Sequence, residues 1–305
     1  MTGRLVVLCP GQGGQHAGMF DMARTDPAGS RLLDAWFDDP LLAAPLREAP
    51  GFSNRVAQPS IVAATLAMWT ALGELPAQPV LVAGYSIGEL SAYGVARALD
   101  PLDTIRLAVE RARMMDACLV AGAPQAMVAF SGMPVGSVDE LLDRFGFYRA
   151  IVTGEDTLVA GGPASGRDAL AAAAVQAGGR VTVLPVEVAS HTPLLQGAVA
   201  PFAALLHRQR WLPPAFPVLS GISAEPVHDG AHAVDRLSRQ IAETIRWQEC
   251  MDACAEAGAT VALELGPGAA LSRMLQMRHP HIACRSVSEF RAVAGIRGWL
   301  ERQLD

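Results

Sequence analysis

Ser86 is the residue of this sequence best suited to nucleophilic chemistry, because it stands at the centre of the motif GYSIG at residues 84–88. Glycines on both sides of a serine permit a very tight turn, and here an apolar run precedes the motif and a helix-forming segment follows it. Such a turn raises the hydroxyl above the edge of a sheet and directs the N–H of the next residue, Ile87, at the place where an oxyanion forms. The motif predicts a nucleophilic serine at a strand–helix corner.

A serine hydroxyl needs a neighbouring base to become a nucleophile, and among seven histidines His191 is the best candidate. It follows the apolar segment RVTVLPVEVAS and precedes a helix that starts with proline, so it can project from a strand end into a cleft. From its position alone, a buried structural role stays open. Hydrolase triads also contain a carboxylate, but no acid between Ser86 and His191 occupies a recognisable strand-end position. The residues therefore predict a serine–histidine pair without pointing to a third carboxylate.

The composition excludes two classes of partner. The net charge of -6 and the isoelectric point of about 5.7 argue against non-specific nucleic-acid binding, which needs a basic surface. No uninterrupted apolar run approaches the roughly 18 residues that cross a membrane, so we expect no membrane association. A length of 305 residues, with 51% apolar residues, fits one large α/β unit that carries a smaller inserted domain.

The cysteines indicate the compartment. They are odd in number and irregularly spaced: Cys9, Cys118, Cys250, Cys254 and Cys284. This pattern predicts free thiols in a reducing compartment, and hence a cytoplasmic location. Cys250 and Cys254 are one helical turn apart, but no histidine or second cysteine pair stands nearby at ligand spacing, so we expect no metal site.

The elements that must position these side chains can be placed from the apolar pattern. We expect buried strands at 4–8 and 79–83, helices at 60–73, 89–97 and 101–118, a strand within VALELG (261–266), and a last helix from about 269. Pro59 is expected to end whatever precedes the helix at 60–73. Each predicted strand runs into a glycine-containing turn, which is typical of strands that deliver functional loops.

The order of elements changes near residue 125. Between residues 125 and 193 the pattern reads strand, helix, strand, strand, helix, strand, which is the ferredoxin-like order. We therefore predict an α/β fold with a hydrolase-like core and a parallel sheet. Its large domain comprises residues 1–124 and 194–305, and an inserted ferredoxin-like small domain comprises residues 125–193.

Five motifs in a fixed order give the sequence a family resemblance. They are CPGQGGQ (9–15), GYSIGE (84–89), TIRLAVERARMM (104–115), ASH (189–191) and ELGPG (264–268). Together they resemble the malonyl-CoA:acyl carrier protein transacylase family, which includes the acyltransferase domains of polyketide and fatty acid synthases. The resemblance runs from residue 5 to about residue 290.

The resemblance implies a role for five residues. Ser86 matches the nucleophile that becomes acylated, and His191 matches its general base. The backbone N–H groups of Gln12 and Ile87 match the oxyanion hole, and the family orients its histidine through backbone carbonyls late in the chain. Arg111, in the arginine helix of the family, matches the residue that binds the free carboxylate of the substrate. A guanidinium binds a carboxylate bidentately, which favours dicarboxylic acyl groups.

The resemblance also implies substrate and partner. Malonyl-CoA is the expected donor, the phosphopantetheine-type thiol of an acyl carrier protein the expected acceptor, and no permanently bound cofactor is expected. Tyr85 and Arg246 stand where the family usually has histidine and glutamine. GYSIGE, the near-terminal CRSVSEFRAVAGIRGWL and the compact length resemble the epsilon subunit of malonate decarboxylase, which loads the carrier subunit of that complex.

Three alternatives stay open. The first is a malonyl transferase of fatty acid or polyketide synthesis. The second is a serine esterase or thioesterase, which the GYSIG motif fits equally well. The third is a non-catalytic subunit that only docks a carrier protein.

Overall fold

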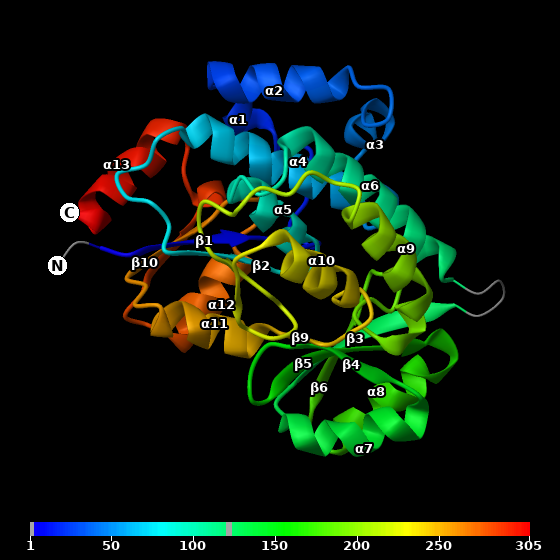
Figure 1. Cartoon of the computed structure of the whole chain (residues 1–305). Coiled ribbons are helices and arrows are strands. Elements are labelled where there is room, and N and C mark those ends of the chain that lie inside the picture. Colours follow the sequence, from blue (N-terminus) through cyan, green and yellow to red (C-terminus); the bar gives the residue numbers. More distant parts are fainter. Residues whose placement is uncertain (1–2, 120–123) are drawn as a thin grey trace.

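Two sheets organise the chain in a computed structural model that describes residues 3–119 and 124–305 (Figure 1). The larger sheet has the order β11 (Ala283–Ser286), β10 (Val261–Glu264), β1 (Leu5–Cys9), β2 (Leu81–Gly84), β7 (Val218–Leu219), β8 (Pro226–Val227). The smaller sheet has the order β6 (Arg180–Leu184), β3 (Gln125–Ser131), β5 (Thr157–Pro163), β4 (Tyr148–Val152), β9 (Ile245–Arg246). The predicted α/β class with a parallel sheet is confirmed, because β11, β10, β1, β2 and β7 pair in parallel.

Helices surround these sheets. They are α1 (Asp21–Arg24), α2 (Pro27–Phe37), α3 (Ala43–Arg47), α4 (Asn54–Leu72), α5 (Ile87–Val95), α6 (Pro101–Ala117), α7 (Val135–Phe145), α8 (Arg167–Gln176), α9 (Gln196–Leu206), α10 (Gly230–Arg239), α11 (Trp247–Glu256), α12 (Ala270–Arg278) and α13 (Val293–Leu304). Short 3-10 turns occur at Ala164–Gly166, Pro193–Leu195 and Val287–Glu289.

The centre of the larger sheet is apolar on both faces, as a parallel sheet requires. Leu5, Val7 and Cys9 of β1 point into a core formed with α4, α5 and α6. Val6 and Leu8 point to the opposite face, where α11, α12 and part of the smaller sheet cover them. Because alternate residues of β1 enter different cores, the strand is apolar throughout its length.

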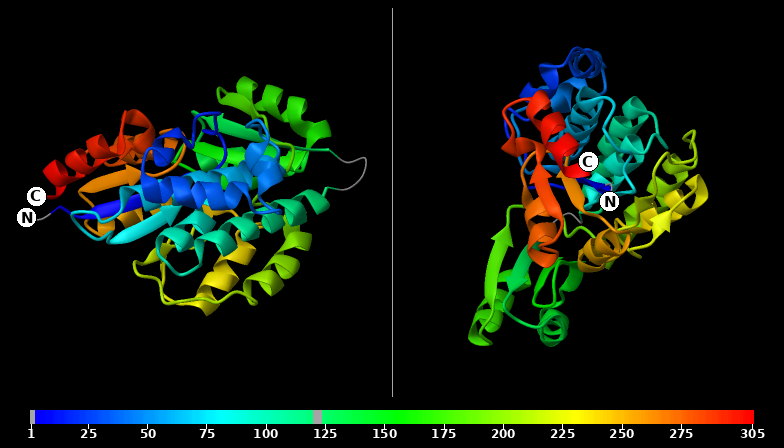
Figure 2. Two further views of the ribbon diagram at one scale, coloured as in Figure 1. Left: turned by 90° about the horizontal axis from the view of Figure 1, so that it is seen from above. Right: turned by 90° about the vertical axis from the view of Figure 1, so that its left-hand side faces the viewer.

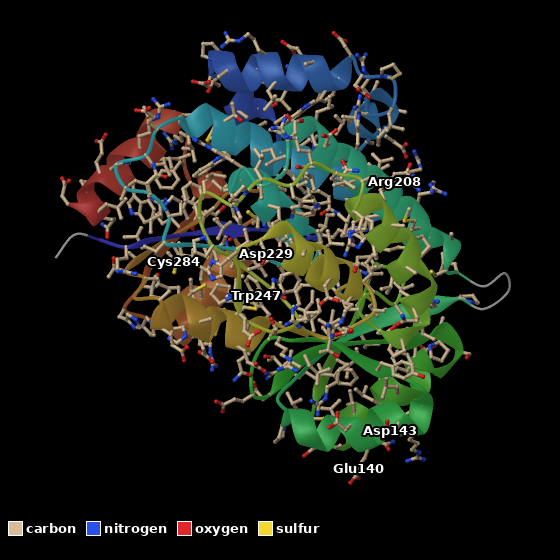
Figure 3. All side chains as sticks on the ribbon, viewed as in Figure 1. Glu140, Asp143, Arg208, Asp229, Trp247 and Cys284 are labelled. Atoms are coloured by element: carbon tan, nitrogen blue, oxygen red, sulfur yellow. The ribbon has the colours of Figure 1, made fainter. Side chains whose placement is uncertain are left out.

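The smaller sheet has the ferredoxin-like arrangement. Its elements follow the order β3, α7, β4, β5, α8, β6, and its four main strands are antiparallel. α7 and α8 pack together on one face, and Glu140 and Asp143 of α7 point away from the rest of the chain (Figure 3). β9 joins this sheet from residues 245–246, beside β4, so a segment outside 125–193 completes it.

Three sequence predictions about the elements are wrong. α4 begins at Asn54 and continues through Pro59, which is buried, instead of starting after it. Most of α4 is buried, and this packing outweighs the roughly 3 kcal/mol that a proline costs inside a helix. α5 begins directly after Ser86 and not at residue 89. The helix from residue 270 is not the last one, because β11 and α13 follow it.

The carboxyl ends of the parallel strands meet at one edge of the larger sheet. β1 ends at Cys9, β2 at Gly84 and β10 at Glu264, and each runs into one of the glycine-containing motifs. Ligands of open α/β sheets bind outside this edge. The termini lie side by side away from the smaller sheet (Figures 1 and 2), where Gly3 donates to the carbonyl of Leu304. Within the described ranges, no helix is both long and apolar enough to cross a membrane.

Candidate active site

Ser86 lies at the corner between β2 and α5, where the sequence predicted it. Its backbone has φ 55° and ψ -117°, a left-handed conformation that is rare for residues other than glycine. Strain of this kind persists where the surrounding structure fixes it, and it is common at functional sites. Here Tyr85 donates its N–H to Cys9 O and Gly88 donates to Tyr85 O, so neighbouring strands and the first helical turn hold the corner in place.

Gly88 permits the start of α5 to pack closely against the main chain at Cys9 and Pro10, because glycine has no side chain. A Cβ atom at this position would lie 2.1 Å from the carbonyl oxygen of Cys9 and 2.7 Å from that of Pro10. Gly88→Ala is therefore expected to lower the free energy of unfolding by about 2–4 kcal/mol, because main-chain atoms must move. Chemical denaturation measures this.

Gly136→Ala is the matched control, since nothing lies within 4 Å of a Cβ added at Gly136 in α7. Alanine in an exposed helix is neutral or stabilises by about 0.5–1 kcal/mol relative to glycine. Equal unfolding free energies for the two variants would contradict the tight contact at Gly88.

His191 reaches Ser86 from a segment 105 residues away, and its Nε2 lies 2.7 Å from Ser86 Oγ. Its Nδ1 lies 2.6 Å from the main-chain carbonyl oxygen of Gln240. A carbonyl oxygen only accepts, so Nδ1 carries the hydrogen and Nε2 presents its lone pair to the serine hydroxyl. The backbone N–H of His191 also donates to Ile241 O, which fixes the residue at both main chain and ring.

His191 is neutral around pH 7. Burial, and then the positive charge of Arg111, lower the pKa of His191 to about 3, against the smaller opposing effect of the Gln240 carbonyl. A neutral imidazole that accepts the serine proton is the arrangement a general base needs. No carboxylate is hydrogen-bonded to this ring among the described residues, in agreement with the absence of a recognisable third acid in the sequence.

Gln12 and Ile87 lie beside the serine. A Cβ added to Gly11 would be 3.6 Å from Ser86 Cβ and 2.8 Å from Tyr85 O, so the loop after β1 contacts the corner. Ile87 is the first residue of α5, where backbone N–H groups have no partner within the helix. Neither the N–H of Ile87 nor that of Gln12 donates to any residue that the structure describes. Both residues therefore adjoin the corner, one through the loop after β1 and one through the chain, and neither N–H is used among the described residues.

Arg111 is 1% exposed and belongs to the same site. Its NH1 donates to Gln58 Oε1 at 2.7 Å and its NH2 donates to Gln240 Oε1 at 3.1 Å. Its Nε has no partner among the described residues. Burial lowers the pKa of Arg111 to about 10, with Glu89 opposing this, so the guanidinium stays charged at neutral pH. A buried cation held only by amides is open to an anionic ligand.

Sequence reasoning missed Gln240, which connects the other groups. Its side-chain Oε1 accepts from Arg111, its Nε2 donates to Ser86 O at 3.0 Å, and its main-chain oxygen accepts from His191. Gln240 follows the last turn of α10 and is fully buried. The sequence LSRQIAE carries no motif around it, so nothing in the sequence distinguishes it from a surface glutamine.

Tyr85 packs edge-on against Trp247, with ring centroids 5.2 Å apart. Burial raises the pKa of Tyr85 far above its ordinary range, so it stays neutral. Trp247, labelled in Figure 3, is buried, while the preceding Arg246 is exposed and faces Glu249 at 3.6 Å. The two residues noted as departures thus differ: Tyr85 supports the corner, and Arg246 lies at the surface.

Metal ligation is not supported by the side chains that the structure describes, which contain no group of three or more His, Cys, Asp or Glu placed to hold an ion. Among the described residues, His191 is the histidine hydrogen-bonded to Ser86, whereas His232 pairs with Asp229 and His279 pairs with Asp252. The arrangement of hydroxyl, imidazole, amide N–H groups and guanidinium suits acyl transfer to and from an acid-bearing substrate.

Known proteins resemble this chain in both sequence and fold. Residues 6–288 match the acyl transferase domain family. The malonyl CoA-acyl carrier protein transacylase of Mycobacterium bovis is 30% identical over 292 residues, covering 93% of this chain and 96% of the relative. Polyketide synthase GfsB of Streptomyces halstedii is 31% identical over 283 residues, which cover 88% of this chain but 5% of that protein. The structure of the malonyl CoA-acyl carrier protein transacylase from Coxiella burnetii has a TM-score of 0.90 and 23% identity, covering 100% of this chain and 99% of that one.

Proposed function

The chain belongs to the acyl transferase domain family, and from this premise we propose that it transfers a malonyl group from malonyl-CoA to the thiol of an acyl carrier protein through an ester on Ser86. The observation that carries the proposal is the buried guanidinium of Arg111. It is joined through Gln240 to the Ser86–His191 pair and has a hydrogen-bond donor left over. Among acyl groups, one that ends in a carboxylate satisfies this cation.

In the first half-reaction, the carboxylate of the malonyl group pairs with Arg111 and the thioester carbonyl lies over Ser86. His191 Nε2 takes the hydroxyl proton as Ser86 Oγ attacks the carbonyl carbon. The negative charge on the carbonyl oxygen is met by the N–H groups of Ile87 and Gln12. The C–S bond then breaks, and the proton on His191 passes to the leaving sulfur of CoA.

The second half-reaction reverses these steps with another thiol. His191 removes a proton from the carrier thiol, whose sulfur attacks the Ser86 ester. The same two N–H groups hold the oxyanion, and the proton returns to Ser86 Oγ as the ester C–O bond breaks. Pairing of the malonyl carboxylate with Arg111 also raises the basicity of His191, because Arg111 is the charge that depresses its pKa.

The carrier is proposed to be the carrier subunit of malonate decarboxylase. The support is the likeness of GYSIGE and of the segment near the end of the chain to the epsilon subunit of that complex. Tyr85 and Arg246 add to it, because they stand where the family usually has histidine and glutamine. No permanently bound cofactor is part of the proposal, and free cysteines fit the reducing conditions of a cytoplasmic location. Loading of a fatty acid or polyketide carrier is the alternative that the relatives favour.

The test is a donor and acceptor survey with the purified protein. Malonyl-CoA is expected to load a phosphopantetheine-bearing carrier protein at least about a hundredfold faster than acetyl-CoA does, because acetyl has no carboxylate to bind the free donor of Arg111. Mass spectrometry of the carrier and quantification of free malonate measure the two outcomes. Release of malonate without carrier loading would make the protein a thioesterase and overturn the proposal. Comparison of carriers from the three pathways decides which one it serves.

A further inference from the structure

Glu89 is a buried acid that the acyl-transfer steps do not use. It lies in the first turn of α5, three residues after Ser86, and is fully buried. Its Oε2 accepts from the N–H of Gly221 at 2.9 Å and from Nε2 of Gln240 at 2.7 Å. Its Oε1 has no partner within the described part of the chain. A fully buried carboxyl with one orphaned oxygen calls for a physical explanation.

Glu89 fixes which way the Gln240 amide faces. The amide NH2 points at the Glu89 carboxyl, and the amide oxygen points at the Arg111 guanidinium, which can only donate. Rotation of the amide by 180° would place donor against donor at one end and acceptor against acceptor at the other. The same residue holds Ser86 O and His191 Nδ1, so Glu89 acts on the site through Gln240.

Arg111 is the charged group that faces Glu89 among the described residues. Tyr93 from the same helix and Cys250 from α11 are also near, but burial raises the pKa of both well above the ordinary range, so both are uncharged. Burial raises the pKa of Glu89 to about 7, against the lowering effects of Gly221, Gln240 and Arg111. When Glu89 is ionised, it and Arg111 form an opposite-charge pair that Gln240 bridges.

A bound acyl carboxylate would place a second negative charge next to Arg111. We propose that Glu89 is a positioning residue that balances the charge of Arg111 in the empty site, and that it takes up a proton when an acyl carboxylate binds there. The inference rests on the proposed function, because that function places the carboxylate on Arg111. The proton comes from solvent and adds to a carboxylate oxygen of Glu89, so one buried negative charge replaces another.

Linkage turns this exchange into a measurable effect. If the bound carboxylate raises the proton affinity of Glu89, then protonation of Glu89 strengthens carboxylate binding by the same factor. Binding is therefore tighter at low pH, where Glu89 is protonated, and weaker as the pH rises through its titration. A coupling of about 1.4 kcal/mol, within the usual range, corresponds to an approximately tenfold change in affinity.

The experiment titrates malonyl-CoA into Ser86→Ala, which holds the donor without cleaving it, by calorimetry at about pH 6 to 9. Measurement in buffers of different ionisation enthalpy counts the protons taken up. The dissociation constant is expected to rise about tenfold over this range, with net proton uptake near pH 7.5. In Ser86→Ala/Glu89→Gln, this dependence is expected to disappear. The CoA phosphates contribute equally to both proteins, so the difference reports Glu89, and acetyl-CoA should show no Glu89-dependent uptake.

The outcomes separate the two proposals. Binding of malonyl-CoA with equal pH dependence in both proteins, or without proton uptake, overturns the role of Glu89 and leaves malonyl transfer standing. If the double variant does not fold, the proton count of Ser86→Ala against malonyl-CoA and acetyl-CoA between about pH 7 and 9 decides, because His191, with a pKa of about 3, remains neutral in that range. No binding of malonyl-CoA at any pH overturns the proposed function and this inference with it.

Discussion

Ser86→Ala is expected to lower the rate of malonyl transfer by about four to six orders of magnitude. The hydroxyl is the atom that bonds to the acyl group, and its 2.7 Å contact with His191 Nε2 is the contact that activates it. The oxyanion donors at Ile87 and Gln12 remain, but without a nucleophile they have no covalent intermediate to stabilise. Transfer to a carrier protein measured by mass spectrometry gives the rate.

Ser91→Ala is the matched control for this variant. Ser91 lies on α5, the helix that Ser86 precedes, is fully buried, and its Oγ has no hydrogen-bond partner within the described residues. Its loss is expected to leave the transfer rate within about threefold of the wild-type rate, because it removes a buried hydroxyl that makes no hydrogen bond to Ser86, His191 or Arg111. A Ser86→Ala protein that retains more than about one-tenth of the activity would contradict the nucleophile assignment.

Arg111→Ala is expected to lower kcat/KM for malonyl-CoA by about two to three orders of magnitude while affecting acetyl-CoA far less. Removal of one partner of a buried charge pair costs about 3–5 kcal/mol, since the other charge is left without a partner. Arg111→Lys is expected to restore little, because a single ammonium cannot contact Gln58, Gln240 and a carboxylate together in the geometry of a planar guanidinium. Steady-state kinetics with both donors measure the change in selectivity.

Arg111→Ala is also expected to change the pH dependence of the reaction. Arg111 is one cause of the low pKa of His191, so its loss raises that pKa above about 3. A base is lost when it is protonated, so activity with acetyl-CoA should begin to fall at a higher pH on the acid side in Arg111→Ala. Arg113→Ala is the control, because Arg113 is exposed on the same helix and pairs with Glu110. Equal acid limbs in all three proteins would contradict the electrostatic link.

The parts of the site that the sequence reveals are those made by local chain geometry. The corner at Ser86 needs glycines beside it, and Gly88 has no room for a side chain against Cys9 O. The role proposed for Gln12 rests on the family resemblance instead, whereas Ile87 is found in the same way as Ser86, because a helix start positions its N–H. These signals extend over fewer than ten residues, so a single sequence carries them.

The side chains that connect the site come from distant parts of the chain and could not be predicted from the sequence. Gln58, Glu89 and Gln240 acquire their roles only when α4, α5 and the end of α10 meet around Arg111. A glutamine in a helix has no sequence signature that separates a buried connector from a solvated side chain. Tertiary packing overrides local preference in the same way at Pro59, which the sequence treats as a helix boundary and the buried α4 includes.

In the small domain, the order of the local elements could be predicted from the sequence, but the strand that joins from outside could not. The order of strands and helices between residues 125 and 193 is visible in the hydrophobic pattern, and the structure has it. β9 is two residues long and pairs with β4 from a segment about 90 residues later, so no periodicity indicates it. The division of the chain at residue 193 therefore stays a prediction.

Acylation of Ser86 can be read from the mass of the protein after brief mixing with malonyl-CoA in the absence of carrier. One added malonyl group per chain is expected, located by peptide mapping on the peptide that contains Ser86, and discharged when a carrier thiol is added. An adduct on another residue, or transfer to carrier with no adduct at any time point in a rapid-quench series, would contradict acylation of Ser86.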